Sequence, residues 1–321
     1  MGLVLRIIRL ARHRQLGTLL VRNKLTLQLR FPLSTMIRFS RPAFSGSKDI
    51  KVLLPNMLRG RRADFAERKV LDVPAGNGDT AQLLLELGAE VTASDLYPEF
   101  FRYPAIECVQ ANLNGTLPFA AASFDFVICQ EGIEHMPNQL HLFQELNRVL
   151  RPGGRAIITT PNYSNLRSRL SYLLLESEAY KLMPPNEVDS IWAADRAYDI
   201  HDVYLGHIFF ANLTRQRALA ALSGLRITEV HPSRVNYTSL FLLPFYYPWM
   251  RLLGGVARRR GLRRGVPSPR RPEVYAELAR LNGSLNVLTG GHLIVEYEKR
   301  AETSEAVAEL TGKLNLATDR T

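Results

Sequence analysis

Residues 131–135, Glu-Gly-Ile-Glu-His, place three side chains that can bind a cation or a proton within five positions. Carboxylates and an imidazole can together hold a divalent metal such as Mg²⁺ or Zn²⁺, and such a metal lowers the pKa of a bound hydroxyl group. Without a metal, His135 is a candidate general acid or base, with Glu134 and Glu131 beside it. The segment also fits a structural role in which it caps the next helix, so three roles stay open.

Two further segments carry candidate polar groups. His201 lies between Asp199 and Asp202 and is either a second base or a solvated surface histidine. Asn162 and Tyr163 follow the apolar run 155–161 and are candidate walls of a pocket.

Gly76 and Gly78 lie in the turn that follows the apolar run 69–73. Glycine lets the backbone turn tightly and approach a ligand closely at the end of a strand. Asp95 ends the next apolar run, nineteen residues after Gly76, where its carboxylate can accept hydrogen bonds from both hydroxyls of a ribose. These residues predict a site for a ligand that contains ribose.

The turn also fits the dinucleotide-binding pattern G-x-G-x-x-A, through Gly76, Gly78 and Ala81, so an NAD-dependent oxidoreductase stays open. Asp72 favours a different ligand. A carboxylate at the end of the first strand attracts the cationic amino group of a methionine-bearing ligand and repels a pyrophosphate. The segment LNRVLRPGGRAIITTPN, residues 146–162, is the second feature that favours this ligand.

Apolar runs typical of buried strands alternate with helical patterns along the chain. We expect helices over 79–88, where Gly88 ends the pattern, and over 138–150. We expect strands over 69–73, 89–95, 124–130, 155–161, 226–231 and 292–299. Strands that alternate with helices predict βαβ units and a mainly parallel sheet.

Four motifs occur in order between about residues 70 and 162: DVPAGNG, the strand-end Asp95, LPFAAASFDFVICQEGIEH and LRPGGRAIITTPN. In these motifs the chain resembles the class I S-adenosylmethionine-dependent methyltransferases, a large group that includes ubiquinone-biosynthesis and many cell-envelope methyltransferases. The resemblance implies an α/β, Rossmann-like fold with a seven-stranded, mostly parallel sheet, helices on both faces and a last strand, here 292–299, that is antiparallel. It implies S-adenosylmethionine as the cofactor.

By the same resemblance, Asp72, Gly76 and Gly78 line the methionine and ribose portions of the cofactor. Asp95 holds the ribose hydroxyls.

Three other positions also take their roles from the resemblance. Asn112 falls where related proteins often have an acid beside the adenine, and Gln130 falls at the end of the fourth strand near the sulfonium. Pro74 stands where the first glycine of the motif is usual. The Pro74 and Asn112 replacements are expected to affect cofactor affinity rather than to remove the site, because the flanking pattern is intact.

Residues 131–135 resemble the Glu-x-x-Glu-His segment of metal-assisted ubiquinone O-methyltransferases and of small-RNA terminal ribose methyltransferases. In the latter a histidine from a downstream His-x-Phe segment completes the metal site, and His207 in GHIFFANLT matches it. The resemblance therefore implies Glu131, Glu134, His135 and His207 as metal ligands. Since His207 lies 72 residues beyond His135, only the fold can bring them together.

The net charge of +11 is unevenly distributed. Residues 1–48 contain ten Lys and Arg and no acid, and residues 258–271 contain seven Arg and no acid, so the rest of the chain is mildly acidic. A protein built to track nucleic acid would have a basic face on its folded body, so nucleic acid is a disfavoured partner. Cys108 and Cys129 show no zinc-ligand spacing, and we expect a reduced, cytoplasmic environment.

The two basic segments define the expected domain organisation. Residues 1–48 form an arm whose first thirty residues read as a basic amphipathic helix: a membrane-surface arm, a targeting peptide or an extension from an upstream start codon. The expected methyltransferase domain covers 49–300, and 301–321 form a tail. About 235–290 are expected to be an insertion before the last strand.

Within this insertion, residues 237–256 nearly have the length of a membrane span, but Pro244, Pro248 and Arg251 interrupt the apolar run. An interfacial helix or hairpin is expected, with aromatic side chains at the headgroup level and the Arg run against anionic lipid. A lid helix over the active site, followed by a disordered basic tail, is the alternative.

The sequence therefore predicts an enzyme that methylates an oxygen of a small-molecule, lipid-linked or glycan acceptor at an anionic membrane surface, to which 237–271 attach it. The alternatives are an RNA ribose methyltransferase with a Glu-x-x-Glu-His metal site and, less favoured, the NAD-dependent oxidoreductase. The sequence does not fix the oligomeric state.

Overall fold

The structure is a computed structural model that describes residues 38–39, 50–180, 182–186, 188, 207–264 and 270–309. The helix expected within 1–30 lies outside the described residues, as do His201 and its neighbouring acids.

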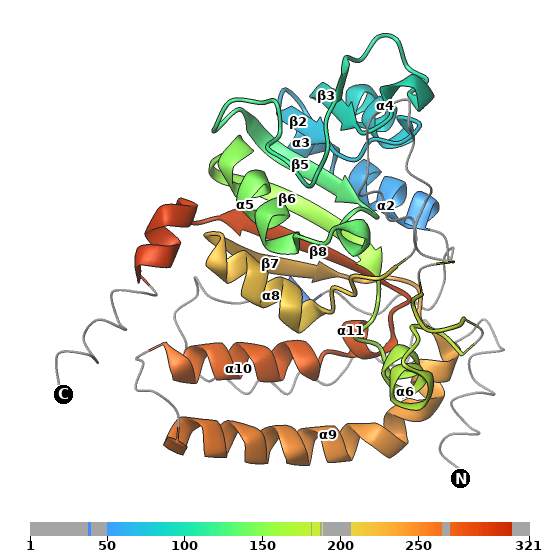
Figure 1. Ribbon diagram of the computed structural model, residues 1–321, viewed down its shortest axis with the longest axis vertical. Coiled ribbons are helices and arrows are strands. Elements are labelled where there is room, and N and C mark those ends of the chain that lie inside the picture. The colour runs from blue at the N-terminus through green and yellow to red at the C-terminus, as the bar shows by residue number, and fades with distance from the viewer. Residues whose placement is uncertain are drawn as a thin grey trace. The chain divides into compact units, whose positions relative to one another are not determined.

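The described chain is built on one sheet with the strand order β1-β7-β8-β6-β5-β2-β3-β4 (Figure 1). β8 runs antiparallel to its neighbours β6 and β7, and the other pairs are parallel. In chain order the strands are β1 (Arg38–Phe39), β2 (Lys69–Asp72), β3 (Glu90–Asp95), β4 (Cys108–Gln110), β5 (Phe124–Gln130), β6 (Leu150–Pro161), β7 (Leu225–His231) and β8 (His292–Lys299). Strands β2 to β8 confirm the expected seven-stranded sheet with an antiparallel last strand, and β1 adds a two-residue pairing beside β7.

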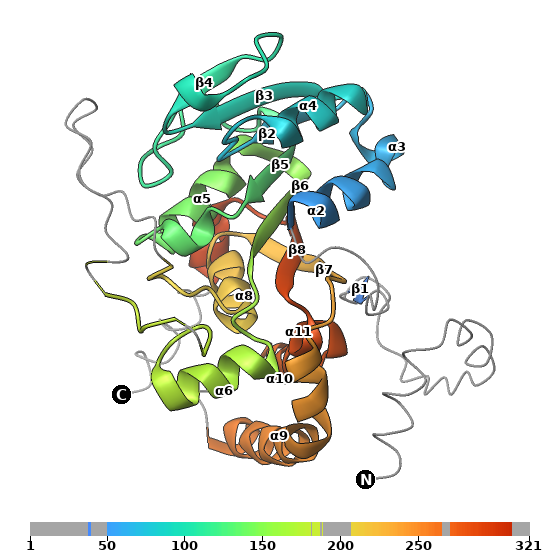
Figure 2. The same ribbon diagram turned by 90° about the vertical axis from the view of Figure 1, so that its right-hand side faces the viewer.

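Helices cover both faces of this sheet, as expected (Figure 2). On one face the core joins the sheet to α5 (Gln139–Val149) and α8 (Leu213–Leu222). On the other face it joins the sheet to α2 (Ile50–Arg59), α3 (Arg62–Phe65) and α4 (Asp79–Glu86). Consecutive strand residues point to opposite faces, so Val127 packs into the first core and Ile128 into the second. Both faces of the central strands are therefore buried, which explains their continuous apolar runs.

The expected strands match the observed ones closely in the centre of the sheet. β5 and β8 have the expected bounds, and β6 begins earlier, at Leu150. The three-residue strand β4 has no counterpart among the runs expected from hydrophobicity.

Three helices lie between β7 and β8: α9 (Tyr237–Arg264), α10 (Arg271–Asn282) and α11 (Leu285–Thr289). Figure 1 shows α9 and α10 side by side beyond α8, and α9 also contacts α6 (Leu166–Leu175). Pro244 and Pro248, expected to interrupt this stretch, lie inside α9. Both prolines are exposed, so water can bind the carbonyls that they leave without an amide partner.

The alternative interpretation expected the Arg run to be a disordered tail. Instead, residues 258–264 form the last turns of α9. Within the described ranges, no helix is both long enough and apolar enough to cross a bilayer.

Candidate active site

The carboxyl ends of β2, β3 and β5 meet where the order of the strands reverses. From β2 the chain proceeds to β3 and β4 on one side, and then returns to β5 and β6 on the other side. Ligands of open α/β sheets bind in the crevice outside the carboxyl ends at such a point. Asp72, Asp95 and Gln130 are the last residues of β2, β3 and β5, so the structure brings these three predicted residues to one edge.

A cavity of about 170 Å³ lies at this edge. Its lining includes Asp95, Asn112, Glu131 and His135, four of the residues chosen from the sequence. Pro74 and Gly132 line it too, and a Cβ built on Gly132 would lie 2.8 Å from Pro74 Cδ. The Pro74 ring therefore packs so closely against position 132 that only glycine fits there.

Asp72 is buried, with 1% of its surface exposed, and neither carboxylate oxygen has a hydrogen-bond partner in the part of the chain that the structure describes. Burial raises the pKa of Asp72 to about 8, the nearby Ala81 amide offsets part of this rise, and the charge of Asp95 adds to it. A carboxylate buried without a partner is energetically costly. Asp72 thus offers a buried carboxyl group beside the switch point, and a cationic ligand would favour its charged form.

Gly76 and Gly78 both have positive φ, of 54° and 89°, which favours glycine at each position. Their surroundings differ. A Cβ on Gly76 would meet nothing within 4 Å, whereas a Cβ on Gly78 would lie 2.6 Å from Phe101 and 2.8 Å from Tyr103. Gly76 therefore faces open space, as expected for a ligand shelf, while Gly78 allows two aromatic rings to pack against the turn.

Asp95 shapes this turn through both carboxylate oxygens. Oδ2 accepts a hydrogen bond from the Gly76 amide at 2.8 Å, and Oδ1 accepts one from the Tyr97 amide at 3.0 Å. A carboxylate has about four lone-pair directions, so each oxygen can accept one more hydrogen bond from a ligand.

The remaining two predicted cofactor residues are held by local hydrogen bonds. Asn112 is exposed, and its Oδ1 accepts from the Asn114 amide at 2.9 Å. Gln130 accepts from the Thr80 hydroxyl at 2.9 Å through Oε1, and it lies beside the cavity rather than in its lining. The bond to Thr80 ties the end of β5 to helix α4.

Glu134, His135 and His207 converge in space. One ligand atom of each lies within 4.8 Å of the others, and the two imidazole rings are 5.3 Å apart. Glu131 does not join this group. Its Oε1 accepts from Thr159 Oγ1, whereas Glu134 Oε2 accepts from Thr160 Oγ1, both at 2.9 Å. Since adjacent residues of β6 point to opposite faces, the two threonines hold the two glutamates apart.

Glu134 is fully buried, and its second oxygen, Oε1, has no hydrogen-bond partner. Burial raises the pKa of Glu134, and the bond from Thr160 offsets part of that rise. His207 Nδ1 contacts Glu178 Oε2 at 3.0 Å, and this hydrogen bond raises the pKa of His207. The hydroxyl of Tyr163 is buried, and burial together with the charge of Glu178 raises its pKa, so Tyr163 stays a neutral donor.

Gln139, which the sequence did not single out, positions His207. Its Nε2 donates to the carbonyls of Ile133 at 2.9 Å and Phe209 at 2.6 Å. The Phe209 amide in turn donates to the Glu134 carbonyl at 3.3 Å. The sequence signal that could have pointed to this link is a glutamine at the start of α5, four residues after His135.

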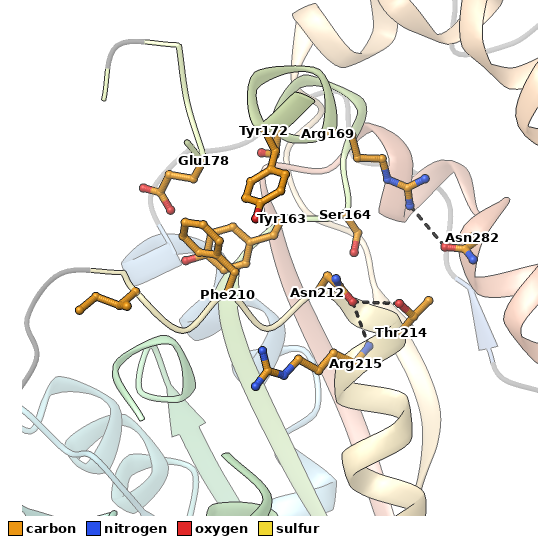
Figure 3. A pocket seen from close by; sticks show the side chains of 12 residues that line it. Tyr163, Ser164, Arg169, Tyr172, Glu178, Phe210, Asn212, Thr214, Arg215 and Asn282 are labelled. Atoms are coloured by element: carbon orange, nitrogen blue, oxygen red, sulfur yellow. Dashed lines mark hydrogen bonds between the residues drawn. The ribbon is translucent and has the colours of Figure 1, made fainter. Parts of the chain in front are cut away.

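Figure 3 shows a larger cavity, of about 600 Å³, whose lining includes the His207 partner Glu178. Tyr163 and Glu178 line it, so Tyr163 is a pocket wall as expected. Asn162 is not in the lining, because its side chain turns to the carbonyls of Val287 and Gly290 at 2.8 and 2.9 Å. Glu178, Tyr163 and His207 thus separate this cavity from the one lined by His135.

Comparisons with protein families, curated proteins and solved structures all find similarity to methyltransferases. Residues 71–158 match the family described as methyltransferase domain. The chain is similar to ubiquinone biosynthesis O-methyltransferases of Xanthomonas oryzae pv. oryzae, with 34% identity over 110 residues, 32% of this chain and 46% of that protein. A protein of the same description from Psychrobacter arcticus is 33% identical over 120 residues, 34% of this chain and 45% of that protein. The chain thus spans less than half the length of these curated relatives.

Among solved structures, an S-adenosylmethionine-dependent methyltransferase from Mesorhizobium loti is similar, with 16% identity, 76% of this chain and 96% of that chain covered, and a TM-score of 0.42. Because this similarity is weak, the fold is described from the chain's own strand order.

Proposed function

We propose that this chain, whose residues 71–158 form a class I S-adenosylmethionine-dependent methyltransferase domain, transfers the methyl group of S-adenosylmethionine to an oxygen of a small-molecule, lipid-linked or glycan acceptor. The observation that carries the proposal is Asp72, a buried carboxylate without a partner at the switch point of the sheet. The ammonium group of the cofactor's methionine end supplies the opposite charge that Asp72 lacks.

The other residues of this edge suit the rest of the cofactor. The free lone pairs of Asp95 suit the two ribose hydroxyls, and the open space at Gly76 lets the ligand approach the backbone. Asn112 lines the cavity where the adenine belongs, and Gln130 ends β5 next to the expected sulfonium.

Methyl transfer forms a bond from the acceptor oxygen to the methyl carbon while the carbon–sulfur bond breaks and S-adenosylhomocysteine leaves. The acceptor hydroxyl must lose its proton, and a positioned base accelerates this step. His135 lines the cofactor cavity, and His207 contacts both His135 and Glu178, which lines the larger cavity, so we infer that this pair lies between the expected methyl donor and the expected acceptor. In this proposal the pair receives the proton, with Glu134 orienting it.

Calorimetric titration of the protein with S-adenosylmethionine tests the proposal, with NADH as the competing ligand. We expect binding of S-adenosylmethionine alone, with a loss of roughly 10- to 100-fold in affinity in Asp72→Asn and in Asp95→Ala, as for hydrogen bonds to charged groups. The control Asp64→Asn removes a partly exposed carboxylate far from this edge and should bind normally. Binding of NADH in place of S-adenosylmethionine would refute the proposal.

Glu134, His135 and His207 also fit a divalent cation. The unpartnered Glu134 Oε1 is the observation that supports this fit, and Glu178 holds His207 through Nδ1 in the way that carboxylates orient metal-binding histidines. When bound, a cation would lower the pKa of the acceptor hydroxyl. Titration of the protein with Zn²⁺ and Mg²⁺ tests the site. Loss of binding in His207→Ala, but not in Glu131→Gln, is the expected pattern.

A membrane surface is the proposed location of the acceptor. Helix α9 has an apolar stripe whose members recur every three or four residues and are all exposed, between 37% and 63%: Phe241, Phe245, Trp249, Leu252 and Val256. Such a stripe on a helix normally faces a core, so its exposure marks a docking surface. The Arg run at 258–264 continues the same helix and suits anionic headgroups.

Sedimentation with vesicles tests the docking surface. We expect binding to vesicles that contain phosphatidylglycerol, weaker binding to phosphatidylcholine alone, and loss of binding in Phe245→Glu and Trp249→Glu. Leu222→Glu, an exposed position on α8, is the matched control and should bind as the unchanged protein does. Release by single-stranded RNA, with no effect of the α9 substitutions, would favour the nucleic-acid alternative instead.

A further inference from the structure

Arg169, on helix α6, is a half-buried cation that has no anionic partner among the residues that the structure describes. Within the described ranges, the contacts of its guanidinium are neutral: Nη2 donates to Asn282 Oδ1 at 3.4 Å, and Nη1 approaches Met250 Sδ at 4.0 Å. Burial lowers the pKa of Arg169, with no opposing contribution from a carboxylate. A guanidinium removed from water is costly unless an anion accompanies it.

Arg169 lies at the junction of two cavities. One is the 600 Å³ cavity beside His207, in which Figure 3 shows Arg169 extending toward Asn282. The other, of about 660 Å³, lies between α9 and α10, and both Arg169 and Asn282 line it as well. A ligand bound at Arg169 can therefore extend into both cavities.

The wall of the first cavity nearest to His207 is aromatic. The Tyr163 ring lies 4.7 Å from the Phe210 ring and 6.5 Å from the His207 ring. Tyr172 continues the wall, 6.2 Å from Phe210. The carboxylate in this lining, Glu178, is already held by His207, whereas Arg215 adds a second positive charge. The charges of the first cavity thus favour an anionic ligand.

The second cavity has a largely apolar lining, which includes Tyr247, Met250, Leu253 and Leu278. Gly254 and Gly255 also line it, and a Cβ on either glycine would meet nothing within 4 Å. Two adjacent glycines therefore leave room between α9 and α10 that larger side chains would fill. Arg251 and Arg258 supply the charges of this lining, and both are positive.

We propose that the two cavities together hold the methyl acceptor, an amphipathic molecule whose phosphate or carboxylate binds Arg169, whose reacting end enters the first cavity beside His207, and whose apolar chain lies between α9 and α10. The inference rests on the proposed function and narrows its acceptor to anionic molecules with a long apolar chain. It also explains why the lining of both cavities includes the same arginine.

Calorimetry with defined probes tests the inference: dodecyl phosphate below its micellar concentration, ethyl phosphate, inorganic phosphate and the neutral dodecyl maltoside. We expect dodecyl phosphate to bind best. Arg169→Gln should weaken its binding roughly 10- to 100-fold, the range for a hydrogen bond to a charged group. Arg167→Gln, on the same helix but outside both linings, should have no effect.

A second pair of variants tests the position of the apolar chain. Gly255→Leu fills the second cavity and should weaken dodecyl phosphate about tenfold, the usual scale of overpacking, while ethyl phosphate binds unchanged. Val256→Leu adds bulk to the exposed stripe instead and is the matched control. Because leucine favours helix over glycine, Gly255→Leu should fold.

Equal binding of dodecyl phosphate to the unchanged protein and to Arg169→Gln would overturn the inference, as would equally tight binding of dodecyl maltoside. Inorganic phosphate that binds as tightly as dodecyl phosphate would overturn the role of the second cavity. Titration of the unchanged protein with S-adenosylmethionine separates the two proposals. Failure to bind S-adenosylmethionine refutes the methyltransferase proposal, whereas binding of S-adenosylmethionine without binding of dodecyl phosphate refutes only the acceptor site.

Discussion

Two buried carboxylates of the same sheet, Asp72 on β2 and Glu296 on β8, have opposite surroundings. Asp72 has no hydrogen-bond partner. Glu296 receives Arg61 Nη1 at 2.6 Å and His231 Nε2 at 3.1 Å on Oε2, and Arg155 Nη1 at 3.3 Å on Oε1. Burial alone would raise the pKa of Glu296, but the hydrogen bonds from His231 and Arg61 outweigh burial and lower the pKa to about 2.

The difference separates two uses of a buried charge. Glu296 joins β8 to β7 through His231, to β6 through Arg155 and to the α2–α3 connection through Arg61, so its charge supports the fold. Asp72 destabilises the free protein in its charged form, and its charge is useful once a cationic ligand arrives. Glu229, His231 and Glu296 also have metal-compatible spacing, but the arginines already occupy both oxygens of Glu296.

The largest effect is expected for Glu296→Gln. The substitution removes the buried charge that Arg61 and His231 share, although Asp64 still pairs with Arg61 and Glu229 with His231, so we expect the free energy of unfolding to fall by about 3 kcal/mol. Urea denaturation at pH 7 measures this change. A loss below about 1 kcal/mol, typical of surface ion pairs, would show that Glu296 does not support the fold in this way.

Asp72→Asn should act in the opposite direction. A neutral amide of the same shape cannot take the charge that burial disfavours, so we expect the free protein to become more stable by about 1 to 2 kcal/mol at pH 5. The same variant should lose affinity for S-adenosylmethionine. A loss of stability without S-adenosylmethionine would contradict the contrast with Glu296.

The two residues should also differ in the pH range over which they change stability. The pKa of Asp72 rises from 3.8 to about 8 on folding, so its contribution to stability falls as pH rises between these values. The contribution of Glu296, whose pKa falls from 4.5 to about 2, is complete above pH 4.5 and is lost below it.

We measure the free energy of unfolding from pH 5 to 7 and compare its slope against pH. The slopes of the unchanged protein and Asp72→Asn should therefore differ by up to about 1.4 kcal/mol per pH unit. Glu296→Gln should retain the slope of the unchanged protein over this range. Identical slopes in all three proteins would show that Asp72 keeps an ordinary pKa.

The smallest effect is expected for Arg155→Gln. Arg155 is 46% exposed in its side chain, and Arg61 and His231 still hold Glu296 when it is removed. We expect a loss of about 0.2 to 1 kcal/mol by urea denaturation, reduced further by added salt. A loss as large as that of Glu296→Gln would mean that Arg155 is the main partner of Glu296.

The sequence predicted the edge formed by β2, β3 and β5 better than the surroundings of the two larger cavities. Strands β2, β3 and β5 are buried on both faces, so their apolar runs end at the polar residues that form the site. Strand β4 was missed because three residues, Cys108–Gln110, give no hydrophobic period.

Around the two larger cavities, the lining residues lie on helices and connections, where spacing in the sequence does not reveal which side chains contact one another. Gln139, Glu178 and Arg169 gain their roles from contacts across the fold. The pairing of His207 with His135 was predicted from the resemblance alone. Only the structure shows that Glu131 and Glu134 bind threonines on opposite faces of β6. The helical continuation through Pro244 and Pro248 depends on their exposure, which periodicity does not determine.

The position of β8 between β6 and β7 has a consequence for how the chain is synthesised. β8 is made last of the strands, after helices α9 to α11, although it occupies an inner place in the sheet. At roughly 5–20 residues per second, β6 and β7 leave the ribosome several seconds before the strand that pairs with both. During that time the edges of β6 and β7 lack the strand that they share and are open to wrong partners.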